Sequence, residues 1–298
     1  MVVIGVCGIT GLQGGAVAQQ FLKNNHKVIG ITRNKDSLNA KKRRSPNLIL
    51  RTGDYDNVDS LKGIFNGCDA VFVMTNFWEH MDSKKEFNQA KNIIDSAVES
   101  NINHIVWSSL EDTRDFSDEI GYLGDYKVPH FDEKGMVSKY LDTLSINVTH
   151  LYTSFYYENF LGLMKLKKDD DGIRRLCLPM RDSVLPIVSV EDIGKMAYHV
   201  VEHKVYGKVG VAGDHLRCNE ISSILSESIN EPVIYVSVPA EMYRGFGFPG
   251  CKDLGNMFEF KDIHNKDFCE LRNMDSVKSR IVPIDFKTWC LEHRDSLV

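Results

Sequence analysis

The first 153 residues alternate between short β-branched apolar runs and segments with helical spacing. The strand-like runs are "VVIGV", "KVIGI", "NLILR", "AVFVM", "HIVWSS" and "NVTHLY", and the helical segments between them cover 12–24, 35–44, 57–66, 83–100 and 130–145. Strands that alternate with helices form right-handed βαβ crossovers, and hence a parallel sheet with helices on both faces. We therefore predict an α/β fold in which residues 1–153 form a six-stranded, doubly wound Rossmann domain.

The alternation loosens after residue 153. A strand-like "SVLPIVSV", a helical "VEDIGKMAYHVVEH" and a second strand-like "KVGVAG" follow, and the last sixty residues are rich in Phe, Gly and charge. We expect residues 154–298 to form a smaller α+β domain on the substrate side, and part of 184–213 to return to the N-terminal sheet.

Composition excludes several classes of protein. The net charge is −5 and both signs are mixed along the chain, so no overall basic field would attract nucleic acid or an anionic membrane. The seven cysteines are scattered, with no C-x-x-C pair, which argues against a disulfide framework or a zinc site. No apolar run approaches the roughly 18 residues of a membrane span. We expect a cytoplasmic protein without a metal or a membrane partner, and a nuclear location stays open as well.

The most informative motif is the glycine pattern directly after the first strand. "GITGLQG" places Gly8, Gly11 and Gly14 as G-x-x-G-x-x-G at the start of a helical segment, with Thr10, Leu12 and Gln13 between the glycines. Glycine is needed at the tight turn and where the backbone approaches a pyrophosphate, whose charge then lies on the helix N-terminal amides. This context predicts a dinucleotide-binding loop; the alternative is a turn that is merely rich in glycine.

The end of the second strand indicates which dinucleotide binds. The position roughly 20 residues past the glycines, where a carboxylate would hold an adenosine ribose 2′-hydroxyl, is occupied by Arg33 in "TRNKD". A guanidinium can bind a 2′-phosphate bidentately, so the sequence favours NADP(H) over NAD(H), with Asn34 and Lys35 beside it. The alternative is that Arg33 is a solvated loop residue.

Polar residues also follow the third and fourth strands. "GDYDN" places Asp54 and Tyr55 at the carboxyl edge of the sheet, and "MTNFW" places Thr75, Asn76 and Phe77 at the same edge. We expect these residues to lie beside the adenine and the nicotinamide respectively. A helix N-cap at Asp54 and a core position for Phe77 are the alternatives.

Candidate catalytic residues follow the fifth strand. Hydride transfer to a carbonyl needs a proton donor beside the developing alkoxide, and short-chain dehydrogenases supply it from a serine and a Tyr-x-x-x-Lys pair. This chain has Ser108 in "VWSSLED", but no Tyr-x-x-x-Lys, and the next helix offers His130 and Lys134 in "HFDEK". Reductase chemistry with His130 as the acid is one hypothesis; in the other, Lys134 only binds cofactor and His130 fills the place of the tyrosine.

Motifs spread from about residue 3 to 295, among them "GITGLQGG", "GDYDN", "VMTNFW", "HFDEKG", "YYENFL" and "GFPGCKDLGNMFEF", resemble the NmrA-like family of atypical short-chain dehydrogenases, and its animal NADPH-sensor branch in particular. The resemblance implies NADP(H) contacts at the glycine loop, at Arg33 and its neighbours, at the polar residues after the third and fourth strands and at Lys134, and also at Tyr156, Tyr157, Glu158 and Asn159. The two tyrosines would otherwise be interpreted as aromatic core. Where the sensor has a cofactor-side lysine, this chain has Asn88.

Two functions follow from these patterns and from the resemblance. The first is an NADP(H)-binding redox sensor or regulator that responds to the NADPH/NADP ratio, with regulatory protein partners. The second is an NADPH-dependent reductase of a small carbonyl or quinone, in which Lys134 binds ribose and His130 or Ser108 assists proton delivery. The missing tyrosine favours the first, and a homodimer is compatible with both.

Overall fold

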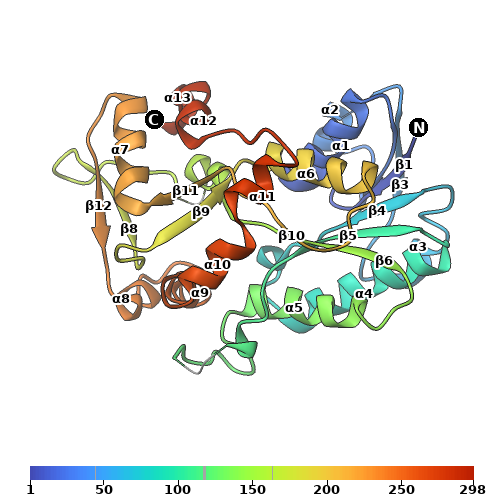
Figure 1. The fold of residues 1–298 in the computed structure, drawn as a ribbon, viewed down its shortest axis with the longest axis horizontal. Coiled ribbons are helices and arrows are strands. Elements are labelled where there is room, and N and C mark those ends of the chain that lie inside the picture. The colour runs from blue at the N-terminus through green and yellow to red at the C-terminus, as the bar shows by residue number, and fades with distance from the viewer. Residues whose placement is uncertain (44, 117–118, 163) are drawn as a thin grey trace. The chain divides into compact units, whose positions relative to one another are not determined.

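Six strands from the N-terminal half and one from later in the chain form a seven-stranded sheet in the computed structural model (Figure 1). The structure describes residues 1–43, 45–116, 119–162 and 164–298. The order of the sheet is β10-β6-β5-β4-β1-β2-β3, and every pair from β6 to β3 is parallel. The strands are β1 (Val3–Val6), β2 (Lys27–Thr32), β3 (Leu48–Thr52), β4 (Ala70–Val73), β5 (His104–Ser109), β6 (Asn147–Tyr152) and β10 (Gly207–Gly210). The predicted six-stranded, doubly wound arrangement is confirmed, with β10 added beside β6.

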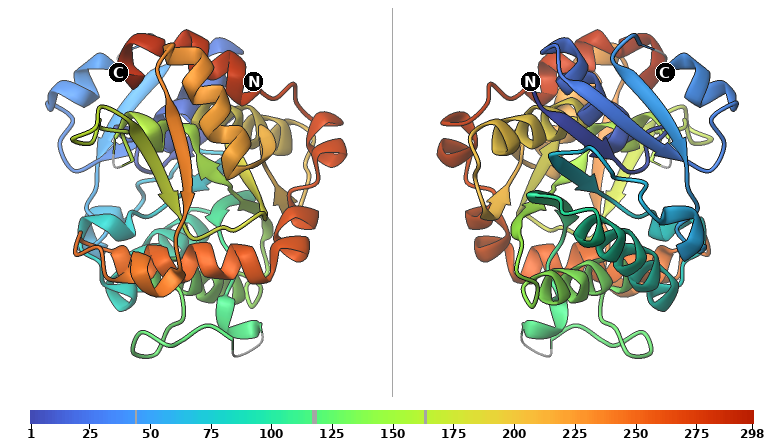
Figure 2. Two further views of the ribbon diagram at one scale, coloured as in Figure 1. Left: turned by 90° about the vertical axis from the view of Figure 1, so that its left-hand side faces the viewer. Right: turned by 90° about the vertical axis from the view of Figure 1, so that its right-hand side faces the viewer.

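Helices cover both faces of this sheet, because its central strands are apolar on both sides. All residues of β4 and β5 are buried. Figure 1 shows α1 and α6 on one face and α4 and α5 on the other, and the right-hand view of Figure 2 shows α4 lying along the sheet. The helices are α1 (Leu12–Lys23), α2 (Leu38–Lys42), α3 (Val58–Leu61), α4 (Ser83–Glu99), α5 (Pro129–Leu141) and α6 (Val190–Glu202).

The strand order fixes where a ligand can lie. The sheet runs outward in opposite directions from β1 and β4, and in such sheets ligands bind at the carboxyl ends of the strands where the order reverses. The glycine loop follows β1, and Thr75 follows β4 by two residues. The fold therefore places both at the expected edge.

Two of the predicted helices are shorter than their sequence pattern suggests. The segment 57–66 contains only α3, because Gly63 adopts a φ of +65° just after the helix and breaks it. The segment 35–44 contains only the short helix α2, which begins after an N-cap at Ser37.

The chain divides into two compact units of similar size. Unit 1 comprises 1–112, 130–152 and 193–209, and unit 2 comprises 113–129, 153–192 and 210–298. The segment 113–129 thus groups with the C-terminal half, although it lies before the predicted boundary at residue 153. Of the segment 184–213, only β10 joins the large sheet, because β9 pairs within unit 2.

Unit 2 contains two small sheets and a set of helices. One sheet has the order β11-β9-β7 and the other pairs β12 with β8 in parallel. The strands are β7 (Phe155–Tyr156), β8 (Arg174–Leu178), β9 (Val184–Val188), β11 (Asp214–Arg217) and β12 (Val233–Ser237). The helices are α7 (Cys218–Ile229), α8 (Ala240–Arg244), α9 (Cys251–Ile263), α10 (Asn265–Leu271), α11 (Met274–Lys278), α12 (Phe286–Glu292) and α13 (Arg294–Leu297).

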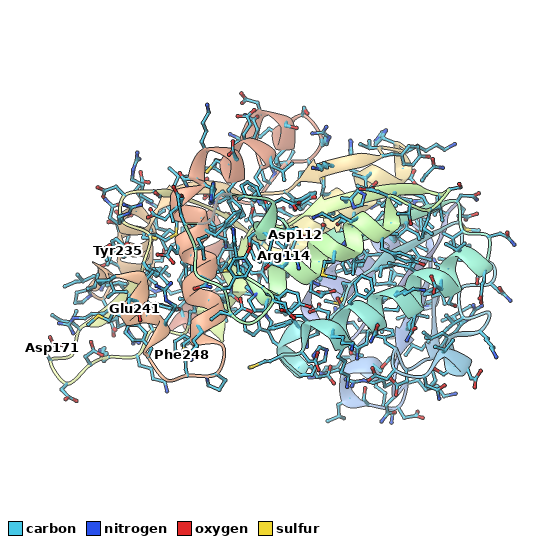
Figure 3. The ribbon with its side chains drawn as sticks, turned by 90° about the horizontal axis from the view of Figure 1, so that it is seen from below. Asp112, Arg114, Asp171, Tyr235, Glu241 and Phe248 are labelled. Atoms are coloured by element: carbon cyan, nitrogen blue, oxygen red, sulfur yellow. The ribbon has the colours of Figure 1, made fainter. Side chains whose placement is uncertain are left out.

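Helix α5 is held tightly against the end of β5 in unit 1. A Cβ atom on Gly135 would lie 2.5 Å from Cβ of Asp112, which is labelled in Figure 3, so only glycine allows this approach. Lys139 Nζ, one turn further along the helix, reaches the Asp112 carboxylate at 2.9 Å. These contacts fix the helix that carries His130 and Lys134.

No helix in the described parts of the chain is long and apolar enough to cross a membrane.

Candidate functional site

The glycine loop between β1 and α1 has the geometry of a phosphate-binding turn. Gly8 adopts a φ of +63°, which favours glycine, and its carbonyl accepts a hydrogen bond from Gly11 N–H at 2.9 Å. A Cβ atom on Gly14 would lie 2.5 Å from the Cys7 carbonyl oxygen and closer still to that of Gly8. Glycine at these positions therefore lets strand, loop and helix pack closely. Thr10 and Leu12 lie on the exposed side of the loop, where the leucine side chain is largely solvent-accessible.

The residues after β3 support this loop from the side. The Tyr55 hydroxyl oxygen accepts a hydrogen bond from Gly8 N–H at 2.9 Å, and burial raises the pKa of this phenol well above its usual value. Asp54 is exposed, and its carboxylate accepts a hydrogen bond from Asp56 N–H at 3.0 Å. The N-cap of α3 is Asn57, so the alternative that Asp54 caps this helix is wrong. Tyr55 thus holds the glycine loop, and Asp54 shapes the turn beside it.

Two arginines lie near the loop. Arg33, at the end of β2, has a side chain that is 66% exposed and forms a bidentate ion pair with Glu79. Arg43, which follows α2, donates to the Gly11 carbonyl oxygen at 3.3 Å and occupies the space that a Cβ on Gly15 would need. From the sequence, the basic run at 41–44, which includes Arg43, is interpreted as the exposed end of a helix, with phosphate contact as a weaker alternative; the pairing of Glu79 with Arg33 was missed because only the tertiary fold brings them together. Asn34 and Lys35 are exposed beside Arg33.

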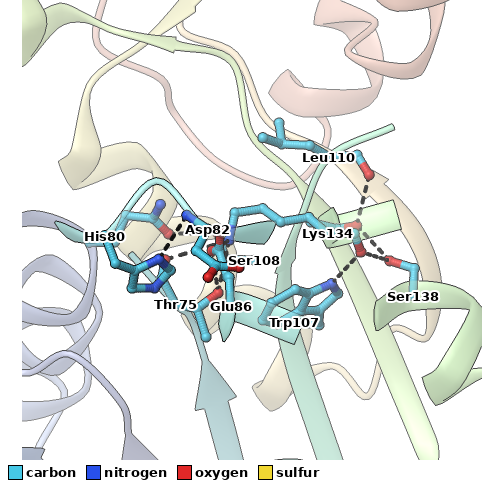
Figure 4. Close-up of polar contacts among 11 residues, drawn as sticks. Thr75, His80, Asp82, Glu86, Trp107, Ser108, Leu110, Lys134 and Ser138 are labelled. Atoms are coloured by element: carbon cyan, nitrogen blue, oxygen red, sulfur yellow. Dashed lines mark hydrogen bonds and ion pairs between the residues drawn. The ribbon is translucent and has the colours of Figure 1, made fainter. Parts of the chain in front are cut away.

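Lys134 is fixed at the carboxyl ends of β4 and β5 by contacts of both its ammonium group and its carbonyl. Its Nζ atom donates to Glu86 Oε1 at 2.8 Å and to Thr75 Oγ1 at 3.1 Å, and it lies 4.9 Å from the centre of the Trp107 ring (Figure 4). The Lys134 carbonyl accepts from Trp107 Nε1 at 3.2 Å. Lys134 is only 9% exposed, so its charge is balanced mainly by Glu86.

A second buried carboxyl group lies against Glu86. Burial alone would raise the pKa of Glu86, but the Lys134 charge and the hydrogen bonds from Lys134 and Thr75 outweigh it and lower that pKa. Burial, followed by the charge of Glu86, raises the pKa of Glu133 well above its usual value. Both shifts favour the negative charge of the pair on Glu86.

The other predicted residues of this edge are held by internal contacts. Ser108 is buried, and its hydroxyl donates to Gln13 Oε1 at 2.8 Å, so these two candidates lie together. His130 is buried in an aromatic cluster, with its ring centre 4.8 Å from that of Trp78 and 6.0 Å from that of Phe77. The structure thus gathers the predicted residues from β1, β4, β5 and α5 at one edge of unit 1. Asn76 is exposed at the same edge.

The group Tyr156 to Asn159 belongs to unit 2. Tyr157 is fully buried, and its hydroxyl donates to the Ile284 carbonyl at 3.0 Å, so its side chain is part of the core of that unit. The Glu158 carboxylate accepts hydrogen bonds from Val190 N–H at 3.2 Å, which caps α6. Tyr156 and Asn159 are half-buried in β7 and in the turn after it.

Glu86 is the main residue that sequence reasoning missed, although a signal was present. Glu86, Ala90, Ile93, Ile94 and Ala97 share one face of α4, and all are buried. A carboxylate on an apolar helix stripe needs a buried partner, and Lys134 is that partner. Asn88 lies elsewhere on the same helix, where it is exposed and lines a separate hollow with Lys84 and Lys85.

The amino-acid sequence is similar to those of known proteins along most of the chain. The model of the NmrA-like family matches residues 2–289. The NmrA-like family domain-containing oxidoreductase notA' of Aspergillus versicolor is 33% identical over 210 residues, which are 63% of this chain and 57% of notA'. The chain thus matches little more than half the length of that relative. The similar oxidoreductase cpsB of Aspergillus campestris is 28% identical over 284 residues, covering 87% of this chain and 82% of cpsB.

Solved structures share the fold. NmrA, a negative transcriptional regulator, in complex with NADP superposes with a TM-score of 0.83 at 20% identity, over 98% of this chain and 94% of that one. The Citrobacter triphenylmethane reductase complexed with NADP(H) gives 0.76 at 20% identity, over 98% and 99%. The predicted fold and family are confirmed, while particular closeness to the animal NADPH sensor stays a prediction. The chain belongs to the NmrA-like family.

Proposed function

We propose that unit 1 binds NADP(H), with the pyrophosphate on the glycine loop and the 2′-phosphate beside Arg33. The observation that carries this proposal is the loop itself, where the positive φ of Gly8 and the close packing of Gly14 against the Cys7 and Gly8 carbonyls bring the N-terminus of α1 directly after β1, as in a phosphate-binding turn. Arg33, which is paired with the exposed Glu79, and Arg43, which donates to Gly11, supply the positive charge that a 2′-phosphate requires. Several structural neighbours that were crystallised with NADP, NADP(H) or NADPH support the same choice.

Redox sensing is the role that we propose for this binding. Ser108 and Lys134, which would act in a conventional reductase, make short hydrogen bonds to Gln13 and Glu86, and His130 is packed among aromatic rings. None of these three groups offers an exposed proton donor in place of the missing tyrosine hydroxyl. Cofactor occupancy would instead report the NADPH/NADP ratio to regulatory protein partners, provided that the two cofactor forms favour different conformations. A second copy of this chain is a further proposed partner.

Reduction of a small carbonyl or quinone is the second candidate function. The observation that favours it is the cluster of Lys134, Glu86 and Glu133, because a buried acid beside an ammonium can supply a proton after hydride transfer. The names of the fungal relatives, which call them oxidoreductases, and an Escherichia coli NADPH-dependent quinone oxidoreductase with a TM-score of 0.75 at 18% identity, over 97% of this chain and 99% of that one, support it too.

The two functions are separated by following NADPH oxidation. Purified protein is mixed with NADPH and a panel of quinones, aldehydes and enones, and the near-ultraviolet absorbance is recorded. The sensor role predicts stoichiometric binding without turnover. Steady turnover that is lost in Lys134→Met and in His130→Ala, while the latter still binds NADPH, would replace the sensor role with the reductase role.

A further inference from the structure

Three buried carboxyl oxygens beside Lys134 require an explanation. Glu86 Oε2 and both oxygens of Glu133 accept no hydrogen bond from any other group in the described residues, and both side chains are fully buried. A buried acceptor without a donor is costly, and a buried charge without one is more so. The cluster is therefore unstable as two carboxylates.

The contact between the two carboxyl groups supplies the missing donor. Glu133 and Glu86 lie in the same buried cluster, and each of the two carboxyl groups shifts the pKa of the other. Two carboxylates only accept hydrogen bonds, and a bond between them exists only when one carries a proton. Lys134 Nζ and Thr75 Oγ1 both donate to Glu86 Oε1, so they stabilise the ionised form of Glu86. The proton therefore belongs on Glu133.

We propose that Glu133 is a neutral carboxylic acid that donates its proton to Glu86 and thereby positions the Lys134 ammonium. One shared proton leaves the cluster with one negative and one positive charge, which is the balanced state for groups that water does not reach. Glu133 is thus a positioning residue that acts on Lys134 through Glu86. The inference rests on the proposed function only where it treats Lys134 as a cofactor ligand.

The surroundings of Glu133 support this assignment. The charged groups that act on it are Glu86 from α4 and Lys134 from its own helix, α5. Figure 4 also shows His80 and Asp82 near Thr75 and Glu86, where the Asp82 N–H donates to His80 Nδ1 at 3.1 Å. A glutamine would fill the site of Glu133 equally well, and because it is always neutral it would not have to stay protonated. An acid that costs stability at this place indicates a functional role.

The first test is the pH dependence of stability in the cofactor-free protein. An unfolded glutamate loses its proton above about pH 4.3, whereas folded Glu133 keeps it, so the folded state binds one more proton from about pH 5 upward. Stability from this group is complete below the unfolded pKa and is lost as pH rises toward the folded one. The unfolding constant of the wild type should therefore rise tenfold per pH unit relative to that of Glu133→Gln.

The matched control is Glu99→Gln, the same change at an exposed position of α4. It should follow the wild type in parallel across the same range. Infrared spectra provide a second measurement: the folded wild type at neutral pH should show the carbonyl stretch of a protonated carboxylic acid, which Glu133→Gln should lack. Parallel pH curves for the wild type and Glu133→Gln, or an unchanged infrared band, would overturn the proposal.

The positioning role is tested by cofactor affinity. Glu133→Ala removes the donor to Glu86 Oε2 and should weaken NADPH binding about tenfold, the loss expected for one charge-assisted hydrogen bond. Glu133→Gln should recover most of this loss, because its amide N–H can donate to the same oxygen. Equal affinities in the alanine variant and the wild type would refute the positioning role. A protein that shows the pH effect but binds no NADPH would instead refute the proposed function.

Discussion

Removing the charge of Lys134 tests whether its ammonium group balances the buried charge of Glu86. In Lys134→Met the Thr75 hydroxyl remains as a donor to Glu86, but the partner ammonium, 2.8 Å from Glu86 Oε1, is lost. Breaking a buried ion pair from one side costs about 3–5 kcal/mol. Glu86 can limit this loss by binding a proton, which for a carboxyl of ordinary pKa costs about 3.7 kcal/mol at pH 7 at 1.36 kcal/mol per pKa unit. We therefore expect the free energy of unfolding to fall by about 3 kcal/mol.

The direction of the pH effect follows from the same pair. In the wild type the folded pKa of Glu86 lies below its ordinary value, so the pair contributes stability above about pH 4.3 that is lost as pH falls. Without Lys134, burial raises the pKa of Glu86 and the variant gains stability as pH falls. The difference between the two proteins should therefore be largest near neutral pH and shrink toward about pH 4.5.

Urea unfolding followed by circular dichroism, at neutral pH and at about pH 4.5, measures both effects. Lys91→Met is the control, because Lys91 forms an exposed ion pair with Asp95 on α4, and such pairs contribute about 0–1 kcal/mol. If Lys134→Met loses less than about 1 kcal/mol of stability at neutral pH, or if the loss does not shrink in acid, Lys134 does not balance the charge of Glu86.

Three further variants test the loop and its surroundings. Gly14→Ala should lower the melting temperature, because its Cβ would overlap the carbonyls of Cys7 and Gly8. Gly11→Ala, whose Cβ would lie 3.3 Å from Gly8 O, should stay folded and mainly weaken NADPH binding. Identical effects of the two variants would contradict this geometry. Tyr55→Phe leaves Gly8 N–H without its acceptor and should cost about 1–3 kcal/mol in urea unfolding, and unchanged stability would argue against this support. Glu79→Gln frees Arg33 from an exposed competitor and should tighten NADPH binding by up to about fivefold in calorimetry, whereas weaker binding would show that Glu79 assists the cofactor.

The sheet could be predicted from the sequence because its signals are local. Strands β1 to β5 are each a run rich in apolar residues followed by a helical segment, and the glycine pattern directly reflects the backbone constraints at Gly8 and Gly14. Residues at strand ends, such as Thr75 and Ser108, were placed by topology alone, since the carboxyl ends of parallel strands meet at one edge.

The remaining features depend on contacts between distant segments. Arg43 reaches Gly11 across 32 positions, and Lys134 reaches Glu86 across 48, and no local pattern encodes such distances. Glu133 lies in a helix that is buried almost all round in its first turns, so the usual alternation of apolar and polar faces did not mark it. Tyr157 was expected at the cofactor from the resemblance, but the core of unit 2 surrounds its side chain.

In the proposed function, unit 1 binds NADP(H) through the glycine loop and selects it over NAD(H) with Arg33. The most direct measurement is a calorimetric titration of the wild type and of Arg33→Ser with NADPH and with NADH. Loss of a charge-assisted bidentate contact is worth about 1.5–3 kcal/mol, so the wild type should prefer NADPH by at least about tenfold and Arg33→Ser should lose that preference. Equal affinities of the wild type for the two cofactors, or a preference that survives in Arg33→Ser, would contradict the claim.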